Sequence, residues 1–234
     1  MNNLSTELQN LPISKLKDIL KQFDIGYLRE DSKKTLIKHI VDRYTDVKRY
    51  VSYTYIRQLG AEGKEGRTFL ATNDSGEEFA IKIFKNSKSS SGIEREARLQ
   101  TIAAEYGISP KVKEYSGTGK YIVMDVLDVN LYDVFCKQKG RLSISQQKSV
   151  MKLFKKLDEC GVFHGDPNPL NFMSKNGKWY IIDFGFAKPV KAGERPNMKY
   201  MPLGFKLKLK EVYSQVNLEY IDKVLTPSQG RKGS

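Results

Sequence analysis

The stretch HGDPNPLN, residues 164–171, decides how the rest of the chain is interpreted. It places a carboxylate, Asp166, and two carboxamides, Asn168 and Asn171, in one loop that two prolines stiffen. Asp183 follows within IIDFGFA, directly after a short apolar run. Taken alone, each stretch predicts no more than a polar turn. Only their order relative to other stretches decides whether they carry chemistry.

Composition limits the class of protein. The chain has 234 residues, a net charge of +13 and two cysteines. This length suits one or two domains that need no disulfide, and so few cysteines favour a reducing compartment. No stretch approaches the roughly 20 apolar residues of a membrane span, and MNNLSTELQN lacks the pattern of a signal peptide. We therefore expect a soluble intracellular protein of the cytoplasm or nucleus, cellular or viral in origin, without membrane contact.

The positive charge creates a field that attracts phosphate-rich partners, whether nucleotide, nucleic acid or acidic protein. Lysines used only for solubility would explain the same charge. The charge therefore allows such partners and selects none of them.

The first 44 residues contain two amphipathic helical patterns. Between Leu11 and Tyr44, apolar residues recur at spacings of three and four, first at Leu16, Ile19, Leu20 and Phe23 and then at Leu36, Ile37, Ile40 and Val41. The loop DIGYLREDS joins them, and Asp31 or Ser32 can cap the second helix. Two helices of this size bury little apolar surface, so we expect a very small module or an extension docked on the rest of the chain.

From Tyr53 the pattern changes to that of a β-meander. YTYIRQL, RTFLAT and EFAIKIF are rich in β-branched and aromatic residues, and NDSGEE, residues 73–78, is typical of a hairpin turn. A helical pattern follows over residues 89–107, and YIVMDVL has the composition of a short buried strand.

The second half of the chain is more helical. An apolar stripe predicts a helix over about 145–160 that leads into the loop 164–171. A hairpin turning at 175–178 then connects this loop to Asp183. Beyond Lys188 we expect a basic, loop-like segment with one helix from about Lys208 to Leu218.

The stretch LGAEGKEGRTFLA, residues 59–71, joins two predicted strands through Gly60, Gly63 and Gly66. A turn without Cβ atoms can bring amide N–H groups close to phosphate oxygens, although it is more often only a hairpin. A Rossmann-type loop is excluded because a strand follows, not a helix.

Lys82 lies in the middle of the apolar strand FAIKIF. Apolar surroundings are unfavourable for an ammonium group unless an anion receives it. Glu96 on the following helix is the candidate partner, and Glu94 is the alternative. A lysine on the solvent face of an edge strand would be equally consistent with the pattern.

These residue types suit phosphoryl transfer from ATP. That reaction requires the triphosphate to be held, its charge to be neutralised by metal and lysine, and the acceptor hydroxyl to be oriented. Of Asp166 and Asn171, one can accept a hydroxyl proton while the other holds Mg²⁺, which prefers oxygen ligands. Asp183 is a second metal candidate, although an acid after a strand often only caps a turn.

In this order the four stretches resemble the protein-kinase-like fold. Its motifs are a Gly-rich loop, a strand lysine, a catalytic loop with Asp and Asn, and DFG. GKEGRTFLA, AIK, HGDPNPLN and DFG match them from about Tyr53 to Ala187. The resemblance implies an α+β, bilobal kinase-like domain over 51–234. Its parts would be a β-rich N-lobe over about 51–124 and a reduced helical C-lobe over about 128–234, preceded by a helical hairpin over 1–50.

The resemblance also implies ATP and Mg²⁺ as cofactors. Lys82 would hold the α- and β-phosphates and pair with Glu96, Asp166 would be the catalytic base, and Asn171 and Asp183 would bind Mg²⁺. The nucleotide site would further include a phosphate cover and an adenine pocket, formed by Gly60, Gly63, Gly66, Ala80, Met124, Asp125, Leu127 and Met173.

Several departures narrow the family. Gly165 replaces an Arg that in many kinases reaches a phosphorylated activation segment, and Asn168 replaces a Lys of serine/threonine kinases. Ala61 stands where the first loop Gly is expected, and no APE motif follows DFG. With EREARLQTIAAEYGISPKV, these features resemble the kinase subunit of the KEOPS tRNA-modification complex and, more distantly, the RIO kinases. The end QGRKGS is faintly similar to the basic tail of that group.

The predicted activity is ATP- and Mg²⁺-dependent phosphoryl transfer to Ser or Thr of a protein, with ATP hydrolysis as a further outcome of the same chemistry. A protein substrate or partner subunit is implied. One alternative is a small-molecule phosphotransferase, which generally needs a longer helical region after the metal Asp. The other is a pseudokinase or nucleic-acid scaffold that binds ATP or DNA without turnover.

The N-terminal helix pair resembles a SAP motif, a module associated with DNA binding. We therefore expect contact with DNA or RNA through this pair and the basic surface, weighed against a hairpin that only packs on the small lobe. Asp31 stands where the motif usually has Gly, and its charge opposes nucleic-acid phosphate.

Overall fold

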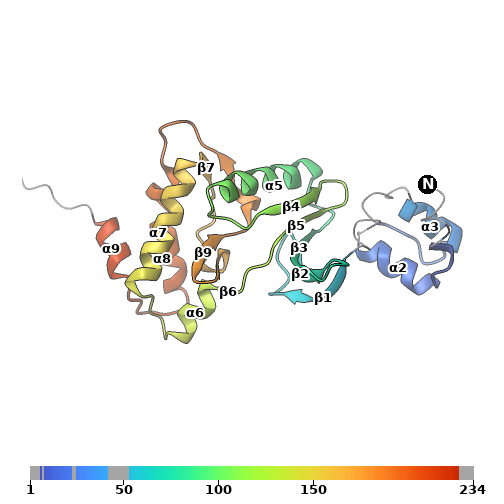
Figure 1. Ribbon diagram of the computed structural model, residues 1–234, viewed down its shortest axis with the longest axis horizontal. Helices are drawn as coiled ribbons and strands as arrows, with labels where there is room; N and C mark the ends of the chain where they lie inside the picture. Colours follow the sequence, from blue (N-terminus) through green and yellow to red (C-terminus); the bar gives the residue numbers. More distant parts are fainter. Residues whose placement is uncertain (1–5, 7, 23–24, 42–52, 227–234) are drawn as a thin grey trace, which may run out of the picture. The chain divides into compact units, whose positions relative to one another are not determined.

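The computed structural model describes residues 6, 8–22, 25–41 and 53–226 (Figure 1). The chain divides into two compact units, Met1–Arg95 with Val112–Val126, and Glu96–Lys111 with Leu127–Ser234. Helix α5, Ser90–Glu105, begins in the first unit and continues into the second. The boundary expected at residue 50 and the QGRKGS tail both lie outside the described residues.

The N-terminal helical hairpin forms as predicted, with α2 at Ile13–Gln22 and α3 at Lys33–Val41. The two helices share an apolar core that includes Leu16, Leu20 and Leu36, each fully buried. Ser32 caps α3, because its Oγ accepts a hydrogen bond from the amide of Thr35 at 3.2 Å. Asp31 instead accepts the amide of Leu28 at 2.8 Å and so closes the preceding turn.

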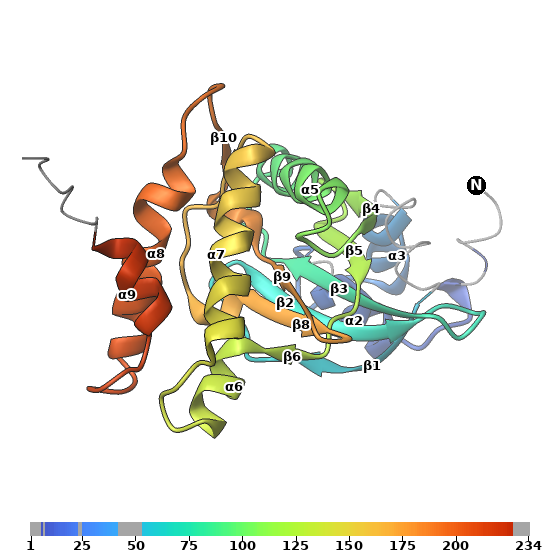
Figure 2. The ribbon, with the colours of Figure 1, turned by 60° about the vertical axis from the view of Figure 1, so that its left-hand side comes forward.

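The predicted meander is part of a five-stranded antiparallel sheet with the order β1-β2-β3-β5-β4. Its strands are β1 Thr54–Leu59, β2 Gly66–Thr72, β3 Glu78–Phe84, β4 Val112–Ser116 and β5 Tyr121–Asp125 (Figure 2). The hairpin turn at 73–78 is confirmed, since Asn73 Oδ1 accepts the amides of Ser75 and Glu77 at 3.1 and 2.9 Å.

Strand β3 lies inside this sheet, because it pairs with both β2 and β5. Lys82 stands opposite Thr68 on one side and Ile122 on the other. The alternative of a lysine on an edge strand is therefore wrong.

The second unit is mainly helical, and its core is rich in phenylalanine. Its helices and short strands are β6 Val129–Asn130, α6 Leu131–Lys137, α7 Ile144–Glu159, β7 Val162–Phe163, β8 Phe172–Lys175, β9 Lys178–Ile181, β10 Lys188–Pro189, α8 Pro196–Lys210 and α9 Glu219–Leu225. Phe154 on α7 meets Phe172 and Phe205 edge to face, with ring centroids 5.7 and 6.4 Å away. Helix α6 was not predicted from the sequence.

Helix α7 and the β8–β9 hairpin confirm two predictions. A capping box of Ser143 and Gln146 starts α7 one residue before the predicted position. The hairpin turns at Asn176 and Gly177, whose φ angles of 51° and 75° are those of a tight two-residue turn.

The single helix expected over 208–218 is wrong. The chain instead forms α8, and then α9 after a turn. Helix α8 contains Pro202 and Gly204, two residues that local propensity disfavours inside a helix. Gly204 lies against the loop 164–171, where a Cβ would come within 2.6 Å of Pro167 Cγ and clash. A close contact with a distant loop thus explains a glycine that local propensity disfavours in a helix.

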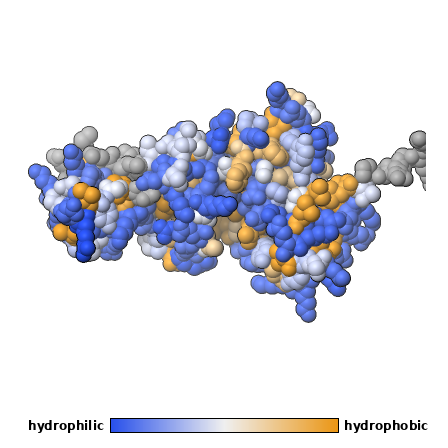
Figure 3. Space-filling view, turned by 180° about the vertical axis from the view of Figure 1, so that it is seen from behind, coloured by the Kyte–Doolittle hydropathy of each residue, from blue (hydrophilic) through white to orange (hydrophobic). Residues whose placement is uncertain are grey.

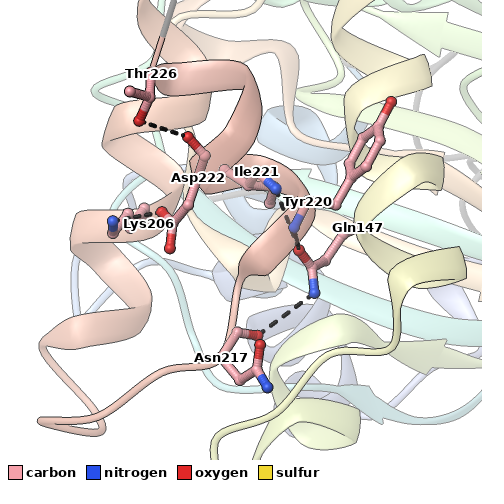
Figure 4. Close-up of polar contacts among 7 residues, drawn as sticks. All are labelled: Gln147, Lys206, Asn217, Tyr220, Ile221, Asp222 and Thr226. Carbon is pink, nitrogen blue, oxygen red and sulfur yellow. Dashed lines mark hydrogen bonds and ion pairs between the residues drawn. The ribbon is translucent and has the colours of Figure 1, made fainter. Parts of the chain in front are cut away.

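A side chain distant in sequence accepts hydrogen bonds from the first backbone amides of helix α9 (Figure 4). Gln147, fully buried on α7, accepts the amides of Tyr220 and Ile221 at 2.9 and 3.2 Å. It also donates to the carbonyl of Leu142 at 2.8 Å. Because this cap is about 70 residues away in sequence, the local pattern could not reveal the helix start.

Hydrophilic residues cover much of the face shown in Figure 3, with apolar patches between them. Among the helices of the described residues, none combines the length and apolar character needed to cross a bilayer.

Candidate active site

The loop between β7 and β8 fixes the carboxylate of Asp166 from both sides. Asn171 Nδ2 donates to Asp166 Oδ2 at 2.8 Å, and the amide of Asn168 donates to Asp166 Oδ1 at 3.2 Å. Each carboxylate oxygen therefore has one internal partner and keeps a lone pair for another group. The two residues singled out in the sequence, Asp166 and Asn171, lie in direct contact.

Asn168 organises this loop. Its Oδ1 accepts the amide of Leu170 at 3.0 Å, and its carbonyl accepts the amide of Asn171 at 2.9 Å. These contacts begin the 3-10 helix Pro169–Asn171. The side chain of Asn168, at the position of the usual Lys, thus accepts a hydrogen bond within the turn and supplies no positive charge.

His164 ties the loop to the segment after β9 that leads to Asp183. The ring is fully buried, and its Nε2 lies 2.9 Å from the carbonyl of Ile182. Burial lowers the pKa of His164 because the imidazolium loses its hydration, which favours the neutral ring. Its Nδ1 faces the backbone of Asp166, 3.4 Å from the amide and 3.1 Å from the carbonyl oxygen. The sequence had assigned no role to this residue.

Gly165 is required by the backbone. Its φ is +80°, and a Cβ at this position would lie 3.2 Å from the carbonyl oxygen of Phe186. A side chain here would be strained and crowded at once. The local fold thus accounts for the absence of the Arg found in many kinases.

Two residues that the sequence did not single out hold the start of the loop. Asn197, fully buried at the start of α8, accepts the amide of His164 at 3.1 Å and donates to the carbonyl of Val162 at 2.8 Å. It also donates to Asp158 Oδ1 at 2.7 Å. Asp158 in turn accepts the amides of Asn197 and Met198, both at 2.9 Å. No local signal marks them, because the two residues are 39 positions apart.

Asp183 follows β9 with a left-handed backbone, at φ 65° and ψ 75°. The amide of its neighbour Ile182 donates to the carbonyl of Asn171 at 2.9 Å. This bond brings the segment of Asp183 against the end of the loop 164–171. Such a conformation is uncommon for a non-glycine residue and often marks a functional site.

The chemistry of these groups fits Mg²⁺. Asp183 offers a carboxylate. Asn171 offers its Oδ1, because its Nδ2 already donates a hydrogen bond to Asp166. Both are the hard oxygen ligands that this ion takes. Asp166, which accepts hydrogen bonds on both oxygens, is suited to orienting a hydroxyl group.

The residues predicted for the phosphates and the adenine lie largely in the first unit. Gly60 has a φ of +69°, and Gly66 permits a close approach, since a Cβ there would lie 2.0 Å from the carbonyl oxygen of Ile83. Ala80 and Met124 stand opposite each other in β3 and β5 and are both buried. Gly63 bonds across the loop, where its amide donates to the carbonyl of Gly66 at 2.9 Å.

Other predicted residues belong to the second unit or to the end of the sheet. Asp125 ends β5 and pairs with Lys113 at 3.0 Å. Met173 in β8 stands opposite Asn130 and Tyr180, and Leu127 begins the segment that leads to β6.

The Lys82–Glu96 pairing stays a prediction, because the two residues belong to different units. Burial distinguishes the two candidate partners, however. Glu96 is 1% exposed, whereas Glu94 lies on the exposed side of α5. A buried carboxylate requires a partner more than an exposed one does, which favours Glu96.

Comparisons with known proteins agree with these motifs. The model of the family described as protein kinase domain matches residues 53–205. The KEOPS complex subunit Bud32 of Pyrococcus abyssi is 33% identical over 96 residues, which is 40% of this chain and 44% of that protein. A probable serine/threonine-protein kinase BUD32 homolog of Archaeoglobus fulgidus is 29% identical over 98 residues, or 41% and 50% of the two chains. The chain thus spans about half the length of the curated relatives it matches.

Proposed function

The chain belongs to the protein kinase domain family, and from this premise we propose that it transfers the γ-phosphoryl group of ATP to a serine or threonine of a protein. The observation that carries the proposal is the bond from Asn171 Nδ2 to Asp166 Oδ2 at 2.8 Å, in a loop held by His164 and Asn197. It pairs a hydroxyl-orienting carboxylate with an oxygen ligand for a metal.

In this proposal each residue has one task. Asp166 accepts the hydrogen bond of the acceptor hydroxyl and takes its proton as the new oxygen–phosphorus bond forms and the bond from the γ-phosphorus to ADP breaks, so that ADP is the leaving group. Asn171 Oδ1 and Asp183 would hold Mg²⁺, which when bound would neutralise charge on the phosphates. Lys82, paired with Glu96, contacts the α- and β-phosphates. The glycines of the loop 60–66 would cover them, and Ala80, Met124, Asp125, Leu127 and Met173 would surround the adenine.

ATP hydrolysis is a second candidate activity, and Asn168 is the observation that favours it. This side chain is engaged by the amide of Leu170 at 3.0 Å, so no lysine at this position helps to neutralise the transferred group. Transfer to a protein hydroxyl then depends more on metal and Lys82, and water becomes a stronger competitor.

The partners are part of the proposal. One relative carries the name of a subunit of the KEOPS complex, and we infer that this chain also works with a partner subunit. We keep residues 1–50 as a separate module that contacts DNA or RNA, and residues 51–234 as the kinase domain.

The test follows labelled γ-phosphate from ATP into protein for the wild type, Asp166→Asn, Lys82→Ala and Asp183→Ala. Loss of a general base is expected to lower the rate by about 10²- to 10⁴-fold. Asp74→Asn, in the exposed turn between β2 and β3, is the control for the loss of one carboxylate. Equal incorporation of labelled phosphate into protein by the wild type and Asp166→Asn would contradict the proposal. Labelled free phosphate without labelled protein would favour hydrolysis.

A further inference from the structure

A second lysine shares the surroundings of Lys82 in the first unit. Lys82 Nζ lies 4.9 Å from the centre of the Phe84 ring, and Lys88 Nζ lies 5.8 Å from the same centre. An aromatic ring attracts cations through its quadrupole, so the ring of Phe84 is a shared partner of both ammonium groups. Two ammonium groups at one ring add their positive fields there, and such a field attracts anions.

The side chain of Lys88 is confined on several sides. It is 10% exposed, and its Nζ donates to both carboxylate oxygens of Glu65 at 2.7 Å. The carbonyl of Lys88 accepts from Lys120 Nζ at 2.6 Å, which fixes the backbone. Its stem passes over Gly92, where a Cβ would lie 3.4 Å from Lys88 Cε. These contacts distinguish Lys88 from the many exposed lysines of this basic chain.

The present partner of Lys88 is an acid within the glycine loop. Glu65 stands between Gly63 and Gly66, and its carbonyl accepts the amide of Lys85 at 2.8 Å. In a loop proposed to cover a triphosphate, a carboxylate opposes the negative ligand. Pairing with Lys88 neutralises it, and a phosphate oxygen can replace it because both are anionic acceptors.

The same loop contains a second, exposed ion pair that serves as a comparison. Glu62 and Lys85 are 2.9 Å apart, with side chains 49% and 44% exposed. The hydrogen bond from Lys85 lowers the pKa of Glu62. Exposed pairs of this kind contribute little, because water screens them. The two pairs join the same loop to the same segment after β3 but differ in burial.

We propose that Lys88 is a second phosphate-binding lysine beside Lys82, and that Glu65 occupies it until the triphosphate of a nucleotide replaces the carboxylate. The exchange makes and breaks no covalent bond. It rests on the proposed function, since it deepens the nucleotide site of that activity.

The experiment measures the affinity for ATP, ADP and adenosine by calorimetric titration with Mg²⁺ present. Lys88→Met is expected to weaken ATP binding by about tenfold, the equivalent of one charged hydrogen bond, and to leave adenosine unchanged. Glu65→Gln is expected to strengthen ATP binding severalfold, because the competing carboxylate is gone. Lys85→Met and Glu62→Gln, the exposed pair, should stay within about twofold of the wild type.

The Glu65→Gln result distinguishes the proposal from a purely structural ion pair. A structural pair predicts weaker ATP binding when either Lys88 or Glu65 is replaced. The double variant Lys88→Met/Glu65→Gln leaves no unpaired carboxylate and should still bind ATP more weakly than Glu65→Gln. The inference would be overturned if Lys88→Met and Lys85→Met had the same affinity for ATP. It would also be overturned if Glu65→Gln bound ATP more weakly than the wild type. Wild type without ATP binding would overturn both proposals, whereas ATP binding without phosphoryl transfer would overturn the proposed activity alone.

Discussion

The loop 164–171 and the glycine loop 60–66 are held in opposite ways. Around Asp166, the contacts are buried and partly buried hydrogen bonds. Asn171 donates to the carboxylate of Asp166, the amide of Asp166 donates to His164, and the amide of His164 donates to Asn197. The glycine loop is held by one hydrogen bond between its own backbone groups, by bonds that its carbonyls accept from Gln58 and Lys85, and by two ion pairs, one of them largely exposed.

This difference suits the roles that we propose for the two loops. A loop that orients a hydroxyl group must keep its geometry, and buried hydrogen bonds are expensive to break because each partner loses hydration. A loop that covers a ligand must change partners, and ion pairs with some access to water exchange readily. Rigidity and exchange are thus assigned to separate parts of the chain.

The most severe break in the buried network is Asn197→Ala. The change removes the bonds to Val162 and Asp158 and leaves the amide of His164 without its acceptor. We expect the free energy of unfolding to fall by about 2–4 kcal/mol in urea denaturation. Asn217→Ala, an exposed asparagine of the same unit, should stay within about 0.5 kcal/mol. Similar values for the two variants would contradict the rigid role of the loop.

A smaller effect is expected from Gly165→Ala, which tests the strain in the loop. Both Gly165 and Gly193 have positive φ, at +80° and +86°, but only a Cβ at Gly165 meets neighbouring atoms. Both variants should lose about 1 kcal/mol from the unfavourable φ. Gly165→Ala should lose up to about 1–2 kcal/mol more from crowding against Phe186. Thermal unfolding of the pair gives the difference, and a larger loss for Gly193→Ala would rule out crowding.

The pH dependence of stability tests the neutral state of His164. The folded ring resists protonation, whereas the unfolded ring binds a proton near its ordinary pKa of 6.5. The unfolded state therefore binds more protons, and stability falls as the pH drops below that value, by up to about 1.4 kcal/mol per pH unit. His164→Gln should remove this slope. His39→Gln, which removes the other histidine of the chain, should preserve it. A slope that persists in His164→Gln would assign it to other groups.

The smallest expected effect concerns salt. Hydrogen exchange of the Lys85 amide, which donates to the carbonyl of Glu65, reports on the glycine loop. We expect it to accelerate about two- to threefold between roughly 0.05 M and 1 M NaCl, because salt screens partly exposed ion pairs. The amides of His164 and Ile182, which donate to Asn197 and Asn171, should not respond. An equal response in both loops would remove the contrast between them.

Much of the fold was readable from local patterns. The strands β1 to β3, the turn at 73–78 and helices α2, α3, α5 and α7 follow from apolar periodicity and from turn and cap residues. Asp166 and Asn171 could be predicted as neighbours because only four residues separate them. The failures are α6 and the region of α8 and α9. Helix α6 has a local cap, Asn130, which accepts the amide of Asp133 at 2.8 Å, whereas the partners that start α8 and α9 are distant in sequence.

The sequence by itself determined the order of four motifs, and this order is enough to indicate a kinase domain because each motif carries one part of the same reaction. Only the tertiary structure explains why residue 165 is a glycine, which amide the side chain of Asn168 bonds, and which residues hold His164. Asp158 and Gln147 cap helices that begin about 40 and 70 residues later, and Lys88 meets Glu65 across a strand. Such contacts depend on packing in three dimensions, and one-dimensional spacing carries no record of them.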